Sequence, residues 1–320
     1  MRIGRFSLLL LLPVLALAAC EPDLQPGPIV DLVGSARLVT NDRRLNAPAD
    51  TLAVRMYARR QGNDEPALER LRITVDYRPT FDPLTYERPF DPNSPPLSSL
   101  LYVDSLLNPN TSSQDFAFQS VLQARTTAGL ETWRYEVTDA EGRTGQRSLR
   151  LRLLRPDSAL VYHSYTLGLQ APGVITRRSF LALRPGLALP RFTVLAREPR
   201  PGAQQLIDLV YVPSATGPIL ATPADAGLNL PAARWPQKRA TQIRNTALTT
   251  LDNSNSATVA ALTAAFDNGT PFPTPTRTGP LRQGQVLAFR TPEGQSGLLR
   301  VETITTTGIP TVAVQVRVTK

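Results

Sequence analysis

The sequence predicts a mainly β protein in which one β-sandwich is followed by a second, β-sandwich-like domain with one short helix. Apolar and polar residues alternate along many short segments, as in strands that bury one face. The chain of 320 residues contains 30 Pro and 19 Gly, which indicates frequent turns. Its 42% hydrophobic residues are enough to fill two cores, and its 19% charged residues exclude a compositionally disordered chain.

The N-terminal segment predicts the subcellular location of the protein. Two arginines precede an apolar run over residues 6–19, which is typical of a secretory signal and shorter than the roughly 20 apolar residues of a membrane-spanning helix. The run ends in Leu, Ala, Ala and Cys20, which resembles the lipobox of bacterial lipoproteins. The resemblance implies that residues 1–19 are a signal peptide and that Cys20 carries a lipid anchor. We therefore expect the bacterial cell envelope, with anchoring to the outer membrane and either a periplasmic or a surface-facing orientation.

The mature chain begins with a tether and continues into the first sandwich. Residues 20–31 contain several prolines, which favour an extended, semi-rigid segment. Residues 32–155 are expected to form the first domain. Segments 52–59 and 70–77 alternate between apolar and polar residues, and residues 133–153 read as two amphipathic strands around a turn.

The last hairpin of this domain resembles a known structural class. Trp133, Tyr135 and Val137 alternate with polar residues, and a turn at Gly142 leads into a final amphipathic strand. This pattern resembles the closing hairpin of extracellular immunoglobulin-like domains. The resemblance implies an immunoglobulin-like sandwich of the disulfide-free bacterial type, because the chain has a single cysteine.

Residues 160–320 are expected to form the second domain, again rich in strands. The predicted strands cover 161–169, 179–183, 206–212, 286–290, 297–304 and 311–319. A helix is expected over 256–266, where apolar residues recur at helical spacing. Ser254 or Ser256 would cap its start, and the Asn-Gly pair at 268–269 would end it.

Short motifs of the second domain resemble envelope lipoproteins of Bacteroidota-type bacteria that carry an N-terminal immunoglobulin-like domain. The matching residues are Ser179-Phe180-Leu181, Ile207-Asp208-Leu209-Val210-Tyr211, Ala221-Thr222-Pro223, Phe289 and Gly297-Leu298-Leu299-Arg300-Val301. The resemblance implies an envelope-anchored protein and brings no established activity with it.

The charge distribution bears on the partners. Residues 156–320 contain 16 basic and 8 acidic residues, a net charge of +8. A basic domain in the envelope attracts anionic lipid headgroups or acidic glycans. No nucleic-acid partner is expected, because the signal removes the chain from the cytosol and no basic run is interleaved with aromatic residues.

Two features single out candidate ligand-binding residues. The proline-rich loop over 78–99 carries Phe81, Tyr86 and Phe90, and Tyr102 follows it. Such rings offer flat faces to a sugar or a peptide, or they fold back over the sandwich and become buried. Asp208 is the only charge in an apolar segment, so we expect it to bond a backbone amide or an arginine, with a ligand role as the alternative.

Catalytic chemistry has little support in the sequence. The Gly-Gln-Ser-Gly segment at 294–297 is one residue short of a nucleophile elbow, and the only histidine, His163, lies in a strand pattern that predicts a half-exposed residue. We expect neither a metal nor a cofactor. The predicted function is that of a non-catalytic, lipid-anchored envelope protein in protein interaction or scaffolding. The alternatives are a glycan-binding surface lipoprotein and, more remotely, a hydrolase.

Overall fold

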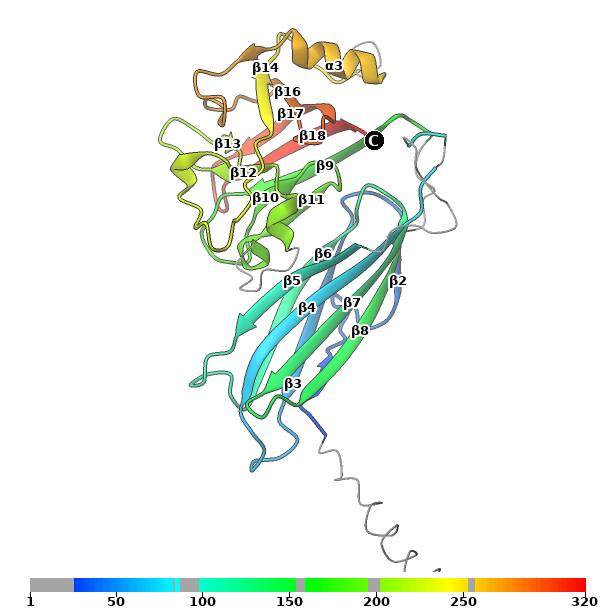
Figure 1. Ribbon diagram of the computed structural model, residues 1–320, viewed down its shortest axis with the longest axis vertical. Helices are drawn as coiled ribbons and strands as arrows, with labels where there is room; N and C mark the ends of the chain where they lie inside the picture. Colours follow the sequence, from blue (N-terminus) through cyan, green and yellow to red (C-terminus); the bar gives the residue numbers. More distant parts are fainter. Residues whose placement is uncertain (1–25, 83, 87–97, 154–158, 195–201, 253–256) are drawn as a thin grey trace, which may run out of the picture.

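The computed structural model describes residues 26–82, 84–86, 98–153, 159–194, 202–252 and 257–320. They form four β-sheets, arranged as two stacked halves of the molecule (Figure 1). The prediction of a mainly β, sandwich-type protein is confirmed.

The first half is a sandwich of two sheets. The smaller sheet has the order β1 (Ile29–Leu32), β3 (Thr51–Arg59), β6 (Asp115–Gln123). The larger sheet has the order β2 (Arg43–Leu45), β8 (Thr144–Leu153), β7 (Gly129–Asp139), β4 (Leu68–Pro79), β5 (Ser98–Leu106). All neighbours are antiparallel except β2 and β8, which are parallel. The predicted hairpin over 133–153 is the pair β7–β8.

Alternation along the strands builds the core of this sandwich, as the sequence predicts. On β4, Leu71, Ile73 and Val75 are buried, whereas Arg72 and Thr74 on the opposite face are partly exposed. Each such aliphatic side chain contributes about 1.5–3 kcal/mol on burial. A slip of one residue in the pairing would turn all of them to solvent, so the pattern also fixes the register.

The second half contains two more sheets that face each other. The smaller has the order β11 (Leu187–Pro190), β10 (Arg178–Ala182), β12 (Leu209–Val212), β13 (Ile219–Ala221). The larger has the order β15 (Thr270–Pro271), β14 (Gln242–Asn245), β16 (Val286–Arg290), β17 (Ser296–Thr305), β18 (Thr311–Thr319), β9 (Tyr162–Gln170). Side chains from both sheets share one hydrophobic core.

Short helices complete the second half. Helix α3 (Val259–Asp267) covers the outer face of the large sheet with Leu262 and Phe266. It begins later than predicted, because the Thr258 hydroxyl accepts the Ala261 N–H and acts as the N-cap. The expected caps at 254 and 256 lie outside the described residues. In the described ranges, three 3₁₀ turns join the strands, namely η1 (Arg191–Val194), η2 (Ala203–Leu206) and η3 (Ala226–Leu228). In the described part of the chain, no helix is both long and apolar enough to cross a bilayer.

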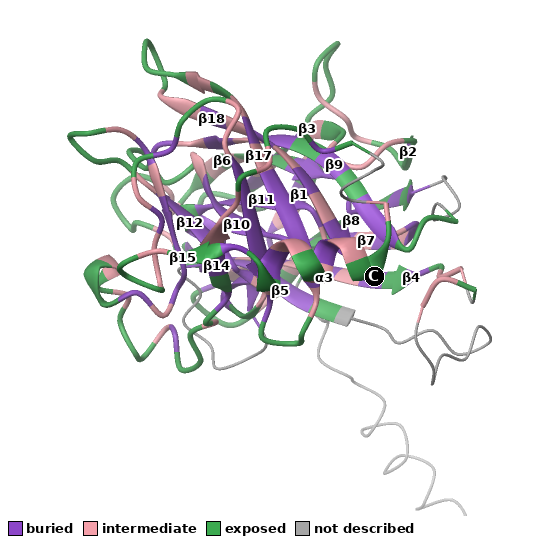
Figure 2. Ribbon diagram, turned by 90° about the horizontal axis from the view of Figure 1, so that it is seen from above, coloured by how far each residue is buried: buried purple, intermediate pink, exposed green. Residues whose placement is uncertain are grey.

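The hydrophobic core of the first sandwich extends into the second half. The Phe192 ring of η1 contacts Tyr102 of β5 and Phe118 of β6, with ring centroids 5.7 Å and 5.3 Å apart. These strands lie at the edges of the two different sheets, so η1 closes the open side of the sandwich. Figure 2 shows buried strands running through the middle of the molecule and exposed residues around its rim. The two predicted domains therefore share one core.

Backbone and side-chain hydrogen bonds reinforce this junction. The segment between β6 and β7 meets the turn between β10 and β11. Thr126 donates its N–H to the Pro185 carbonyl at 3.0 Å and its hydroxyl to the Arg184 carbonyl at 2.6 Å. Gln123 bonds the Gly186 carbonyl and accepts the Ala188 N–H. The halves are consequently held by directional bonds as well as by apolar packing.

Replacing Gly186 with alanine is expected to loosen this junction. Gly186 has φ of +66°, and an added Cβ would lie 2.6 Å from Thr126 Cγ2. The control Gly308→Ala meets almost the same backbone strain, with φ of +68°, but nothing lies within 4 Å of its Cβ. In urea unfolding, we expect Gly308→Ala to lower the free energy of unfolding by about 1 kcal/mol. Gly186→Ala should cost about 1–3 kcal/mol more. Equal losses would show that the contact with Thr126 is unimportant.

Candidate functional site

A pocket of about 540 Å³ opens between the first sandwich and strand β9. Its walls come from residues 45–48 after β2, from the linking segment 124–128, and from the start of β9 at Tyr162, His163 and Ser164. The volume lies within the range of small-molecule sites. The shared core and the hydrogen-bonded junction fix these walls relative to one another.

Arg125, which lines the pocket, belongs to a buried ion pair. Arg125 Nε lies 2.5 Å from Glu131 Oε1, and Trp133 donates its indole N–H to Glu131 Oε2 at 2.8 Å. The Arg125 guanidinium also lies 4.5 Å from the centroid of the Tyr77 ring. Sequence reasoning missed this pair. The available signal was Glu131 itself, a charge at an inward-facing position of β7 two residues before Trp133.

His163 is buried and contacts Tyr86 of the proline-rich loop. This corrects the prediction of a half-exposed residue. Its Nε2 lies 3.2 Å from the Tyr86 hydroxyl, which also lies 3.2 Å from Thr127 Oγ1. Burial, assisted by the nearby charges of Lys320 and Arg184, lowers the pKa of His163 to about 3. The imidazole is therefore neutral at physiological pH.

The predicted aromatic residues do not form one binding platform. Phe81 and Tyr86 are half-buried and lie together, with centroids 4.6 Å apart, but their planes are tilted by 58°. Tyr102 is 3% exposed and packs edge-on against Trp133 in the core, so it cannot offer a face to a ligand. Phe90 and the predicted lipidation site Cys20 lie outside the described residues.

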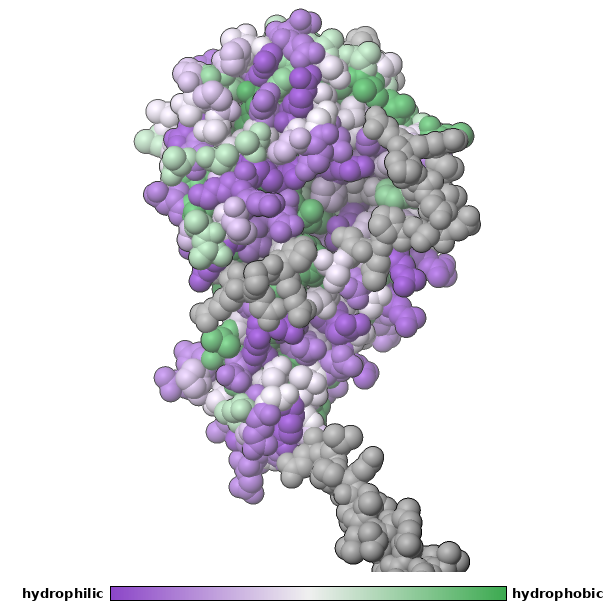
Figure 3. All heavy atoms as spheres, in the orientation of Figure 1, coloured by the Kyte–Doolittle hydropathy of each residue, from purple (hydrophilic) through white to green (hydrophobic). Residues whose placement is uncertain are grey.

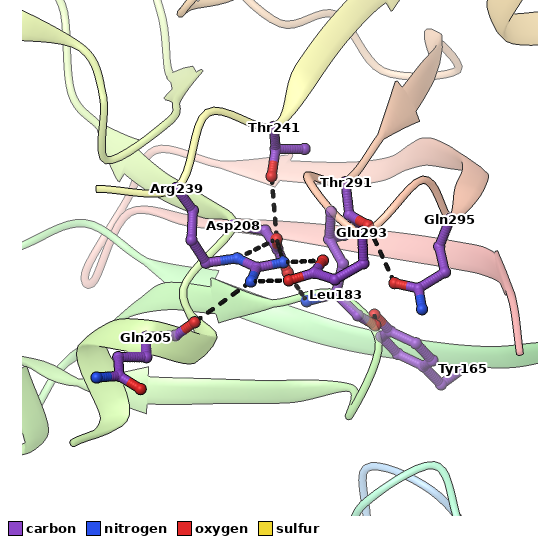
Figure 4. A network of polar contacts seen from close by, with 9 residues as sticks. All are labelled: Tyr165, Leu183, Gln205, Asp208, Arg239, Thr241, Thr291, Glu293 and Gln295. Atoms are coloured by element: carbon purple, nitrogen blue, oxygen red, sulfur yellow. Dashed lines mark hydrogen bonds and ion pairs between the residues drawn. The ribbon is translucent and has the colours of Figure 1, made fainter. Parts of the chain in front are cut away.

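Asp208 forms a polar network in the second half (Figure 4). Its Oδ2 accepts the Leu183 N–H at 2.8 Å, and its Oδ1 accepts from Arg239 Nε at 2.9 Å and from the Thr241 hydroxyl at 3.0 Å. The expectation that Asp208 bonds a backbone amide or an arginine is confirmed. Both carboxylate oxygens are taken by protein donors, so a ligand role for Asp208 would require one of these bonds to break.

Arg239 extends the network to the surface. Its two terminal nitrogens bond the two carboxylate oxygens of Glu293, one of them Nη2 to Oε2 at 2.6 Å. The hydrogen bonds from Arg239 lower the pKa of Glu293 to about 2. Burial raises the pKa of Asp208 against the opposing effect of Arg239. Arg239 thus links the buried carboxylate of Asp208 to the exposed carboxylate of Glu293, which is a structural role.

The residues suggested for hydrolase chemistry do not come together. His163 pairs with Val318, which pairs with Gly297, so His163 and Gly297 share the inner face of the large sheet. Ser296 lies on the other face, opposite Arg290, whose guanidinium stacks on Phe266 of α3 at 4.3 Å. The sheet separates the hydroxyl from the imidazole and excludes proton transfer between them. Within the described ranges, no cluster of three or more metal-ligating side chains occurs.

Comparison with known proteins adds little to this geometry. No protein-family model matches the sequence, and no curated protein matches it. A solved DUF4466 family protein from Parabacteroides merdae is similar in outline, with a TM-score of 0.34 and 13% sequence identity. The match covers 91% of this chain and 98% of that chain. Similarity at this level supports no conclusion about activity.

The burial of His163 predicts a specific pH dependence of stability. Because the folded-state pKa lies near 3 and the unfolded value near 6.5, the unfolded chain binds more protons between these values. The stability from neutral His163 is therefore present above about pH 6.5 and is lost as pH falls. Relative to His163→Gln, the wild type should lose about 1 kcal/mol per pH unit between pH 6 and 4. Parallel stability curves for the two proteins would contradict this. NMR can follow the same titration, since the chain has a single imidazole.

We expect a large loss of folding stability when the buried Asp208–Arg239 pair is broken, and a small loss when the exposed Arg239–Glu293 pair is broken. Arg239→Met leaves the Asp208 carboxylate buried without its cation, and we expect a loss of about 3–5 kcal/mol. Glu293 is about half exposed, so Glu293→Gln should cost less than about 1 kcal/mol. Urea unfolding at pH 7 measures both. Similar losses in the two variants would mean that Arg239 acts through Glu293 instead.

Proposed function

We propose that this chain is a non-catalytic, lipid-anchored protein of the bacterial envelope that acts in protein interaction or scaffolding. The signal-like N-terminus and the lipobox resemblance at Cys20 support the anchor. The structural observation behind the proposal is where the N-terminal segment joins the first sandwich. Gly27 lies against Thr144 and Pro28 against Gly145, at the turn between β7 and β8. This turn is at the end of the sandwich remote from the second half (Figure 1).

An anchor at Cys20 would therefore hold the molecule by its far end. Strand β8 runs from Thr144 to Leu153, about 30 Å along the sandwich. The junction pocket lies at the other end of that strand, where Leu153 forms part of its wall. Because the halves share a core, the protein would present them as one rigid body, which suits a scaffold or an adaptor.

The alternatives receive less support from the geometry. A glycan platform needs exposed, roughly coplanar rings, whereas Phe81 and Tyr86 are tilted and Tyr102 is buried. A hydrolase needs a base near a nucleophile. Ser164, the residue next to His163, is exposed on the opposite face of β9, so its hydroxyl points away from the buried imidazole.

The anchor is tested by Cys20→Ser in the organism or in a bacterial host that processes lipoproteins. We expect the wild type in the membrane fraction and the variant in the soluble envelope fraction, because one residue supplies all of the acyl chains. Intact mass should show fatty acids on the wild type only. Crosslinking of intact cells should then retain a specific envelope protein. Equal membrane retention of both forms would contradict the proposal.

A further inference from the structure

Four arginines gather in a pocket on the first sandwich, away from the junction pocket. The pocket has a volume of about 280 Å³ and is lined by Arg43 and Arg44 of β2, Arg150 and Arg152 of β8, Asp42 and Leu130. All four arginine side chains are exposed. The face of the molecule over the five-stranded sheet is largely hydrophilic in Figure 3. This basic pocket lies outside the net-positive segment 156–320 that the sequence analysis singled out.

The arginines of the basic pocket lack the acidic partners that two other arginines of the same sheet have. On the same sheet face, Arg72 pairs with Glu136 and Arg134 lies 3.9 Å from Asp76. Among the described residues, none of the four pocket guanidiniums forms an ion pair. The nearest acid, Asp42, accepts the backbone N–H of Arg150 at 2.9 Å. Arg72 of β4 and Arg134 of β7 thus have acidic partners, whereas the pocket arginines of β2 and β8 have none among the described residues.

Placing these arginines side by side lowers the stability of the fold. Arg44 lies directly opposite Arg152 in the parallel pair of β2 and β8. Like charges directly opposite each other on neighbouring strands are destabilising. A bound anion would remove that repulsion, and planar guanidinium groups match carboxylate and phosphate oxygens in bidentate geometry.

The cationic row continues beyond the pocket. Arg152 pairs with Leu130, which pairs with Arg78, another exposed arginine with no ion pair among the described residues. The row from Arg44 to Arg78 spans three strand spacings, about 14 Å. That length exceeds a single carboxylate or phosphate. It suits a ligand with several spaced charges, and Leu130 offers an apolar contact between them.

We propose that the basic pocket and Arg78 bind an acidic saccharide through its carboxylate or phosphate groups. The choice of a saccharide rests on the proposed envelope location. None of the described residues that line the pocket is aromatic, so these residues offer no stacking surface of the kind found in single-stranded nucleic-acid sites. The pocket is at the opposite end of β8 from Thr144, where the chain enters. A headgroup of the anchoring bilayer is therefore a less suitable ligand than a polymer at a distance from it.

Titration calorimetry with the purified, unlipidated protein tests the site, using polygalacturonate oligosaccharides as the probe and neutral dextran as its control. The variant Arg44→Gln with Arg152→Gln should bind at least about tenfold more weakly. The control Arg37→Gln with Arg147→Gln removes the same charge at exposed positions outside the pocket and should change the affinity by less than about twofold. Lysine at 44 and 152 should give an intermediate affinity, and 0.5 M salt should weaken wild-type binding.

Several results would overturn the inference. The first is no binding of the oligosaccharide to the wild type at low salt, and the second is an equal loss of affinity in both double variants. The third is competition by inorganic phosphate or by a glutamate-rich peptide that is as effective as competition by the oligosaccharide. Binding only to anionic lipid vesicles would reassign the arginines to headgroups. Melting of the glutamine variant at or above the wild-type temperature shows that its loss of affinity is not unfolding. Calorimetry does not depend on the anchor, so failure here leaves the Cys20→Ser result standing, and the reverse also holds.

Discussion

The insertion of Phe192 between the two sheets of the first sandwich is the contact on which the rest of the structure depends. A sandwich of one three-stranded and one five-stranded sheet cannot cover its own core, and the strands β5 and β6 leave one side open. The ring of Phe192 fills that side from the second half. The linking segment 124–128 and the turn at 184–186 then fix the orientation of the two halves. The linking segment also lines the large pocket, and together with the turn it lines a second pocket that shares Arg125. The large pocket is thus a product of the junction.

The sequence predicts most strands because each buries one face. Strands β16 and β18 have the predicted bounds, since turns delimit runs of alternating or continuous apolar residues. The predicted strand over 206–212 begins only at Leu209, because residues 203–206 form a 3₁₀ turn that packs on the first sandwich. Packing against the first sandwich determines where this strand begins, so the local sequence pattern could not predict it.

The candidate site could be predicted only in part, because it depends on contacts between distant segments. The pairing of Asp208 follows from one charge in an apolar run, whereas its partner Arg239 lies in a segment without periodicity. The burial of His163 arises from the loop residue Tyr86 and from the chain end at Lys320, which no local pattern connects. The cationic row arises because β2 pairs with β8 in parallel, and this places Arg44 beside Arg152.

The place of the last strand has a consequence for biogenesis. Strand β18 lies between β17 and β9 and is the only strand that pairs with β9 among the described residues. The Lys320 ammonium, next to β18, lies near the ring of Tyr86. Pairing over such a long sequence separation is slow. The second core therefore cannot close until β18 has paired, and β9 remains an open edge until then. Chains that lack β18 should consequently expose the edge of β9 and part of the second core to aggregation and proteolysis.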